Sequence, residues 1–493
     1  MPISIEADHR LSKKEFEKRL PELRARLLET QSAFRKADFS VLVIISGVDG
    51  AGKGEVVQRL NEWLDPRGVD TQAFWQPSDE ERERPPYWRF WRMLPAHGRI
   101  AICVGSWYSQ PLVDRVYGRT KNSHLDSALN RVANFERMLA DDGMVILKFA
   151  LHLSKKDQRK RLKDLQKNPE THWRVLPSDW QHHQLYDKFT RTAERVIQET
   201  NTPKTPWFVV EAADRRYRDF TVANILLKSL RQRLAERIAS PSNGPPAKAA
   251  VEARRRSGNA LARVDLSQAL SDKKYRKLLA RYQGKLSRLI WAANDLKIST
   301  VVVFEGWDAA GKGSAIRRLT DAMDPRLYRI IPIAAPTDEE RRHHYLWRFW
   351  RHIPRAGLCT IFDRSWYGRV LVERVEGFAR PDEWKRAYQE IQHFEEQLAE
   401  HRIAVAKFWI HIGKDEQLRR FKKRQDTPYK RYKITDEDWR NRRKWGAYED
   451  AVNEMVARTS TDFAPWTLIA GNDKKFARIQ ILRTLCRTLE KAL

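Results

Sequence analysis

The sequence is short of cysteine and of long apolar runs. Its three cysteines, Cys103, Cys359 and Cys486, are too few for a disulfide framework and lack the spacing of metal ligands. No stretch approaches the roughly 18 consecutive apolar residues of a membrane span. The first residues also lack the basic and apolar regions of a secretory signal. We therefore expect reduced thiols, no membrane association and a cytoplasmic location.

Acidic residues are in deficit as well. The 493 residues include 93 Lys and Arg against 64 Asp and Glu, which gives a net charge of +29. A surplus of that size concentrates anions around a protein and indicates a polyanionic partner. The alternative is a basic surface that is merely solvated, so the charge indicates a class of partner and no more.

The chain does contain an internal repeat. Gly47-Val48-Asp49-Gly50-Ala51-Gly52-Lys53-Gly54 reappears as Gly306-Trp307-Asp308-Ala309-Ala310-Gly311-Lys312-Gly313, an offset of 259 residues (306 − 47). The same offset relates three further pairs of segments: Trp88–Arg92 and Trp347–Arg351, Ser106–Tyr108 and Ser365–Tyr367, and Lys148–Phe149 and Lys407–Phe408. A Pro- and Gly-rich stretch followed by a basic run separates the copies, as is typical of a linker. We expect two domains, residues 1–238 and 263–493, joined by a linker at 239–262.

Strand and helix patterns alternate along each copy. Short runs rich in β-branched residues, at 41–46 and 301–305, are typical of strands buried on both faces of a parallel sheet. Further strands are expected at 358–362, 405–411 and 466–469, and helices at 10–36, 272–296, 314–323, 382–401 and 474–493. This alternation predicts an α/β fold of two tandem three-layer α/β/α domains.

The repeated glycine-rich segment has the spacing of a phosphate-binding loop. Its glycines let backbone N–H groups turn inward, the following helix presents its N-terminus, and the lysine adds a positive charge. In the second copy the predicted phosphate-binding residues are Gly306, Ala309, Ala310, Gly311, Lys312, Gly313 and Ser314. A purely structural glycine turn is the alternative, but the preceding strand, the following helix and the second copy all favour the phosphate loop.

Two acids and an arginine accompany the loop of the second copy. Asp308 would repel phosphate unless a divalent cation lay between them, so we interpret it as a ligand of Mg²⁺; a hydrogen bond within the loop is its alternative role. Asp363 follows a buried strand, where open α/β sheets place their active residues, and is interpreted as the second metal ligand rather than a turn cap. Arg364 can hold two oxygens of a transferring phosphate.

Two more features follow along the chain. Arg369 and Glu373 are further catalytic candidates, although a surface pair one helical turn apart explains them nearly as well. Residues 419–433 hold eight basic residues and one acid, a net +7, against +3 for residues 160–174 of the first copy. We interpret this run as a mobile basic lid over the phosphates rather than a solvated helix face. Its main residues are Lys422, Lys423, Arg424 and Lys430.

The first copy lacks part of this chemistry. Val104 and Gly105 stand where the second copy has Asp363 and Arg364. We therefore expect the second domain to be catalytic and the first to be degenerate, with a structural or chain-binding role. The Trp-Arg-Phe-Trp-Arg motif is present in both copies, which favours packing over base stacking or phosphate contact.

Both copies resemble the polyphosphate kinase type 2 family over nearly their full length. The motifs that carry the resemblance are Glu305–Gly313, Ala335–Glu340, Phe362–Tyr367 and Val372–Val375. The resemblance implies two P-loop-kinase folds, each with a helical lid, dependence on Mg²⁺, and roles for Asp308, Lys312, Asp363 and Arg364 as above. The tandem form is similar to fused-repeat members that pass phosphate to AMP.

Together these observations predict Mg²⁺-dependent transfer of the terminal phosphoryl group of inorganic polyphosphate to AMP, giving ADP. A nucleotide phosphate is already ionised at neutral pH, so the reaction needs charge neutralisation more than a strong base. The expected partners are polyphosphate and AMP or ADP, with no nucleic acid and no membrane; a homo-oligomer is possible. The alternatives are an ATP-dependent nucleoside or nucleotide kinase and a polyanion-binding protein with a degenerate kinase fold.

Overall fold

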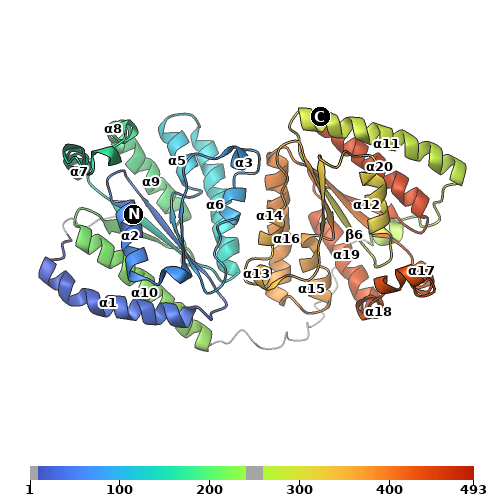
Figure 1. Ribbon diagram of the computed structural model, residues 1–493, viewed down its shortest axis with the longest axis horizontal. Coiled ribbons are helices and arrows are strands. Elements are labelled where there is room, and N and C mark those ends of the chain that lie inside the picture. The colour runs from blue at the N-terminus through green and yellow to red at the C-terminus, as the bar shows by residue number, and fades with distance from the viewer. Residues whose placement is uncertain (1–8, 240–258) are drawn as a thin grey trace. The chain divides into compact units, whose positions relative to one another are not determined.

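The computed structural model describes residues 9–239 and 259–493. The chain forms two compact units, one built mainly from residues before 244 and the other mainly from those after. Each unit contains one five-stranded sheet, and helices cover both faces of each sheet (Figure 1). The predicted three-layer α/β/α architecture is thus confirmed in both units. Most of the predicted linker, residues 239–262, lies outside the described residues.

The first sheet is parallel, with strand order β2-β3-β1-β4-β5. Its strands are β1 (Val41–Gly47), β2 (Val69–Ala73), β3 (Ile100–Val104), β4 (Val145–His152) and β5 (Trp207–Glu211). On one face α1 (Lys13–Phe34), α2 (Lys53–Trp63) and α10 (Arg215–Ala239) pack together. On the other lie α5 (Ser109–Val116), α6 (Asn122–Asp141) and α9 (Tyr186–Thr200).

The second sheet has the corresponding order, β7-β8-β6-β9-β10, and is also parallel. Its strands are β6 (Thr300–Gly306), β7 (Tyr328–Pro332), β8 (Cys359–Asp363), β9 (Ala404–His411) and β10 (Trp466–Ala470). One face carries α11 (Asp272–Asp295), α12 (Lys312–Thr320) and α20 (Lys474–Ala492); the other carries α16 (Pro381–Glu400) and α19 (Trp445–Thr459).

The edge strands β2 and β7 were not predicted from the sequence. Their side chains are mostly exposed or half-buried, because only one edge of each strand is paired and helices cover them poorly. An edge strand of this kind lacks the continuous apolar run that identifies the central strands. The five predicted strand runs correspond to β1, β6, β8, β9 and β10.

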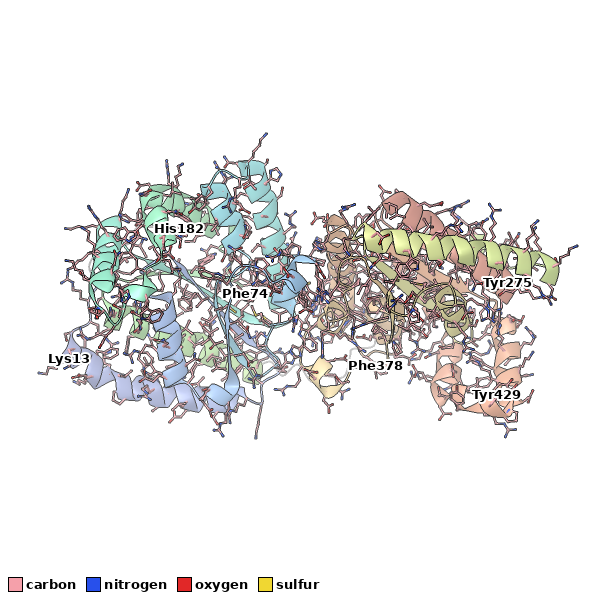
Figure 2. All side chains as sticks on the ribbon, turned by 45° about the horizontal axis from the view of Figure 1, so that its top comes forward. Lys13, Phe74, His182, Tyr275, Phe378 and Tyr429 are labelled. Carbon is pink, nitrogen blue, oxygen red and sulfur yellow. The ribbon has the colours of Figure 1, made fainter. Side chains whose placement is uncertain are left out.

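Helical segments follow the fourth strand of each unit, where the lids were expected. In the first unit these are α7 (Lys155–Lys167) and α8 (Pro177–Gln184); in the second they are α17 (Lys414–Gln425), the 3-10 segment η5 (Pro428–Lys433) and α18 (Asp436–Arg443). Tyr429 projects from η5 and is 73% exposed (Figure 2). No helix among the described residues is both long and apolar enough to cross a bilayer.

A buried polar network explains several of the repeated residues. In the second unit Lys407 Nζ lies 2.7 Å from Glu395 Oε2, and Tyr367 Oη donates to Glu395 Oε1 at 2.7 Å. The first unit repeats these contacts with Lys148, Glu136 and Tyr108. Because a buried charge without its partner is strongly destabilising, each copy must keep the whole set. The tryptophans of the two Trp-Arg-Phe-Trp-Arg motifs are also buried, as the packing interpretation predicted.

Candidate active site

The phosphate loop of the second unit joins β6 to α12. Gly311 caps α12 with a φ of 113°, and Lys312 Nζ donates to the carbonyl of Gly306 at 2.7 Å. A Cβ on Gly306 would lie 2.6 Å from the carbonyl oxygen of Ile410, so only glycine fits there. Ser314 Oγ donates to the carbonyl of Gly311 at 2.9 Å. The loop therefore presents a helix N-terminus and a lysine where an anion can bind.

A buried arginine supports this loop from behind. Arg420, on α17, donates to the carbonyls of Ala309 at 3.0 Å and Ala310 at 2.8 Å. It also donates to the carbonyl of Gly471 at 2.7 Å. Sequence reasoning included Arg420 in the basic lid run and missed this role. The repeat gave no clear sign of it, because the arginine counterpart, Arg161, is not distinctive: Lys422 also keeps a basic counterpart, Lys163.

Asp308 and Arg364, two of the predicted site residues, contact each other at the loop. Arg364 Nη2 lies 3.2 Å from Asp308 Oδ1, and the amide of Asn441 donates to Asp308 Oδ2 at 2.9 Å. The side chain of Asp308 is 14% exposed and that of Arg364 is 44% exposed. The acid is therefore held in place from both sides, while much of the guanidinium remains accessible to a phosphate.

Asp363 is the last residue of β8, which pairs with β6 beside the phosphate loop. Among the described residues, none is recorded as a hydrogen-bond or ion-pair partner of its carboxylate. Arg364, next in the chain, has a φ of +67°, a conformation that costs an ordinary residue of the order of 1 kcal/mol and is common at functional sites. Both residues stand at the carboxyl end of β8, beside the phosphate loop.

A second buried acid, which the sequence analysis missed, supports the same turn. Glu305 is 6% exposed and its Oε1 accepts a hydrogen bond of 2.8 Å from Ser365 Oγ. Burial raises the pKa of Glu305, against the opposing effects of Lys312 and of the Ser365 hydrogen bond. Its counterpart in the first unit is Ser46, so Glu305 is lost together with Asp363 and Arg364. That shared loss was visible in the repeat.

A cavity of about 70 Å³ marks the centre of this arrangement. Its lining includes Glu305, Trp307, Asp308, Arg364, Asn441 and Tyr448. Arg369 and Glu373 are not part of the lining and pair with each other at 3.2 Å. The Arg369 guanidinium also lies 4.5 Å from the ring centre of Tyr345. A direct catalytic role for these two residues stays a prediction.

Three of the predicted lid residues, Lys422, Lys423 and Arg424, lie in the last turn of α17, and Lys430 lies in η5. Lys422 and Lys423 are exposed and Arg424 is half-buried. The side chain of Lys430 lies outside what the structure describes. The placement agrees with a basic cover beside the loop, because α17 also carries Arg420, which contacts that loop.

The acids beside the loop could supply only a few ligands to a divalent cation. Within residues 9–239 and 259–493, no group of three or more His, Cys, Asp or Glu side chains could hold a metal by itself. Mg²⁺ usually takes one or two carboxylates and completes its shell with water and substrate phosphates. Asp308 and Asp363, two carboxylates at the ends of neighbouring strands, fit that smaller requirement.

In the first unit the same acid is neutralised. Asp49 Oδ1 lies 3.2 Å from Lys53 Nζ, and Asp49 Oδ2 lies 2.6 Å from His182 Nδ1 (Figure 2 labels His182). Burial raises the pKa of Asp49, but Lys53 and His182 together hold it well below its usual range. Glu55 replaces Ser314 at the loop and pairs with Arg161 at 2.6 Å and with Arg218 at 3.0 Å. The carboxylate of Glu55 thus places a negative charge at the first loop, where a phosphate would otherwise bind.

A glycine-rich loop at a helix N-terminus, next to an acid and an arginine at the end of a parallel strand, defines a P-loop protein of the phosphoryl-transfer class. The family model described as polyphosphate kinase 2 matches residues 10–237 and 269–493. The chain belongs to the polyphosphate kinase 2 family, and it carries the family domain twice.

Similar proteins have the same tandem form. A polyphosphate:AMP phosphotransferase of Pseudomonas aeruginosa is 53% identical over 99% of this chain and 98% of its own length. Another of that name, from Acinetobacter johnsonii, is 38% identical over 92% of this chain and 91% of its own. A crystal structure of a polyphosphate kinase 2 from Pseudomonas aeruginosa has 51% identity and a TM-score of 0.89, covering 99% of this chain and 98% of that one.

Proposed function

We propose that this protein transfers the terminal phosphoryl group of inorganic polyphosphate to AMP, and that the second unit alone does so. An oxygen of the AMP phosphate forms the new P–O bond, the bond to the next phosphate of the chain breaks, and the polymer leaves one unit shorter. The observation that carries the proposal is the contact of Asp308 with Arg364 beside an accessible phosphate loop. The names of the tandem relatives support the choice of substrates.

Each residue has a role that follows from its charge and position. Lys312 and the N-terminus of α12 bind the phosphates of the donor. Arg364 holds the transferring group, and Arg420 keeps the loop in shape beneath it. Asp308 and Asp363 would hold Mg²⁺, which when bound would supply positive charge to the phosphate oxygens. Arg369 and Glu373 are proposed to border the site rather than to form its centre.

The basic segment that includes Lys422, Lys423, Arg424 and Lys430 is proposed to cover the bound polymer. Exposed lysines one turn beyond a loop-supporting arginine can follow the chain of phosphates and exclude water. Three buried free thiols, Cys103, Cys359 and Cys486, support a cytoplasmic location for this chemistry.

The test is a panel of donors and acceptors on the full chain. Long-chain polyphosphate and ATP serve as donors, and AMP, ADP and adenosine as acceptors, each with and without Mg²⁺. We expect ADP formation from polyphosphate and AMP with Mg²⁺, and loss of that activity with a chelator. A preference for ATP as donor would favour an ATP-dependent kinase and overturn the proposal. Polymer binding without turnover would favour a degenerate, polyanion-binding protein.

A further inference from the structure

The first unit contains a cavity that the proposed function does not use. It measures about 290 Å³, whereas the cavity at the corresponding place in the second unit measures about 70 Å³. It lies beside the first phosphate loop, between the ends of β1 and β4 and the helices α5 and α9. Most of its lining is apolar, including Val48, Ala150, Phe189 and Ile197. Its volume is close to the lower end of the range of small-molecule sites, roughly 300 Å³.

The cavity exists because two indole rings of the second unit have no counterpart in the first. Trp307 and Trp409 are buried in the second unit, with ring centres 5.7 Å apart. The offset of 259 residues places Val48 and Ala150 at their positions. In the second unit Trp307 stacks on Trp445, with ring centres 3.7 Å apart and planes 7° from parallel. The cavity of the first unit therefore occupies the position that a flat, fused ring system fills in the second unit.

The first unit keeps aromatic rings and a histidine at the positions that contact the indole. Tyr186 takes the place of Trp445 and Phe189 that of Tyr448, and both line the cavity. Trp307 Nε1 donates to His411 Nδ1 at 3.0 Å. The counterpart of His411 is His152, which also lines the cavity. Among the described residues, none is recorded as a hydrogen-bond partner of the His152 ring.

We infer that this cavity binds the purine base of a nucleoside or nucleotide. A purine, like an indole, is a flat six-five ring system with polar atoms at its edge. It can stack on Tyr186 as Trp307 stacks on Trp445, and such ring pairs contribute affinity beyond the area that they bury. His152 then meets the edge of the base, and the carboxylate of Glu194, also in the lining, accepts from an exocyclic amino group.

The charges at the rim distinguish this site from the acceptor site of the second unit. Asp49 is already paired with Lys53 and His182, and Glu55 occupies the loop with Arg161 and Arg218. The first unit thus has a place for the base but a neutralised cradle for phosphate. This site binds a purine without transferring phosphate to it, and it goes beyond the proposed function.

The test measures binding to the full chain carrying Asp363→Asn, so that no turnover interferes. Adenosine and AMP are titrated by calorimetry, with free indole as a comparison probe. The cavity is then filled by Val48→Trp with Ala150→Trp, the residues of the second unit at these positions. We expect adenosine to bind one site and the double variant to weaken that binding at least tenfold. In an otherwise wild-type chain, the double variant leaves phosphoryl transfer unchanged.

A second variant guards against misfolding of the first. His152→Phe keeps the ring and removes the polar edge, so adenosine binding falls several-fold while indole binding does not. Tighter binding of AMP than of adenosine at this site identifies a nucleotide, and equal binding identifies a nucleoside; both support the inference. Binding of indole without adenosine or AMP, or adenosine binding that neither variant weakens, overturns it. Because no transfer is measured in the titrations, failure of the proposed function leaves this result intact.

Discussion

The two units share a scaffold and differ in the residues that do chemistry. Both have the same strand order and the same buried network around Lys148 and Lys407. The second unit alone has Glu305, Asp363 and Arg364 around its loop. The buried network common to the two copies maintains the fold, and both copies also keep the loop acid and lysine, Asp49 with Lys53 and Asp308 with Lys312. The residues found only in the second copy separate the proposed catalytic unit from the first.

The backbone records the same difference. Arg364 has a φ of +67°, and Gly105, its counterpart, has a φ of +76°. Glycine adopts this conformation without strain, whereas a residue with a Cβ does not. The second unit therefore tolerates a strained turn in order to place a guanidinium at the loop. The first unit keeps the turn but has lost both the side chain and the strain.

The largest effect is expected at Asp363. Replacing it by Asn removes a negative charge from the proposed Mg²⁺ site without changing the size of the side chain. We expect the rate of ADP formation from polyphosphate and AMP to fall about 10³-fold or more, in line with the loss of a charged group that acts on the transition state. Val104→Asn, at the same position of the first unit, is the matched control and changes the rate less than twofold. Near-normal turnover of the Asp363 variant contradicts the metal assignment.

The two loop lysines give the next comparison. Lys312→Ala removes a positive charge from the donor site, and we expect kcat/KM for polyphosphate to fall about 10²-fold. Lys53→Ala affects a lysine that already pairs with Asp49, so kcat/KM changes less than twofold. Steady-state kinetics with AMP at saturation measures both. Equal losses would show that both units transfer phosphate.

The last prediction concerns the effect of pH on stability, not on the rate of transfer. Burial lowers the pKa of His411 to about 4, from about 6.5 in an unfolded chain. As the pH falls from 6.5 towards 4, the unfolded state takes up a proton that the folded state excludes. The free energy of unfolding of the second unit therefore falls over this window, by up to about 3 kcal/mol from this residue.

His411→Gln is the control for the pH effect, because its amide oxygen can still accept from Trp307 and does not titrate. Urea unfolding at pH 7 and pH 4 measures the difference. The wild type should lose more stability than the variant between the two values. The same loss in both proteins would assign the acid sensitivity to other groups.

Much of the fold could be predicted from the sequence, because the central strands are recognisable as short apolar runs rich in β-branched residues. The runs at 41–46 and 301–305 are rich in β-branched residues and apolar except for Ser46 and Glu305 at their ends, and the same signal appears in both copies. The edge strands β2 and β7 could not be predicted from apolar runs, because they contain exposed or half-buried polar side chains such as Arg329 and Asp70. Their pairing depends on a neighbouring strand that lies far away in the chain.

The candidate site residues could be predicted from the sequence only where they belong to one continuous motif. Asp308 and Lys312 lie in the loop and Asp363-Arg364 ends a strand, so their positions could be inferred. Arg420 contacts residues 110 and 111 positions earlier in the chain, and its spacing gives no sign of that contact. Glu305 is a carboxylate inside an apolar strand, where such a residue is rare, and the available signal was its replacement by Ser46 in the first copy.

Arg420 also limits how the cover over the polymer can move. Its guanidinium donates hydrogen bonds from α17 to the loop carbonyls of Ala309 and Ala310 and to the carbonyl of Gly471, in the turn after β10. The part of α17 up to Arg420 therefore cannot move away from the phosphate loop without breaking these hydrogen bonds. If the proposed cover moves, we expect its pivot to lie near Asp426 and Thr427, so that η5 moves while Lys422 and Lys423 stay beside the loop.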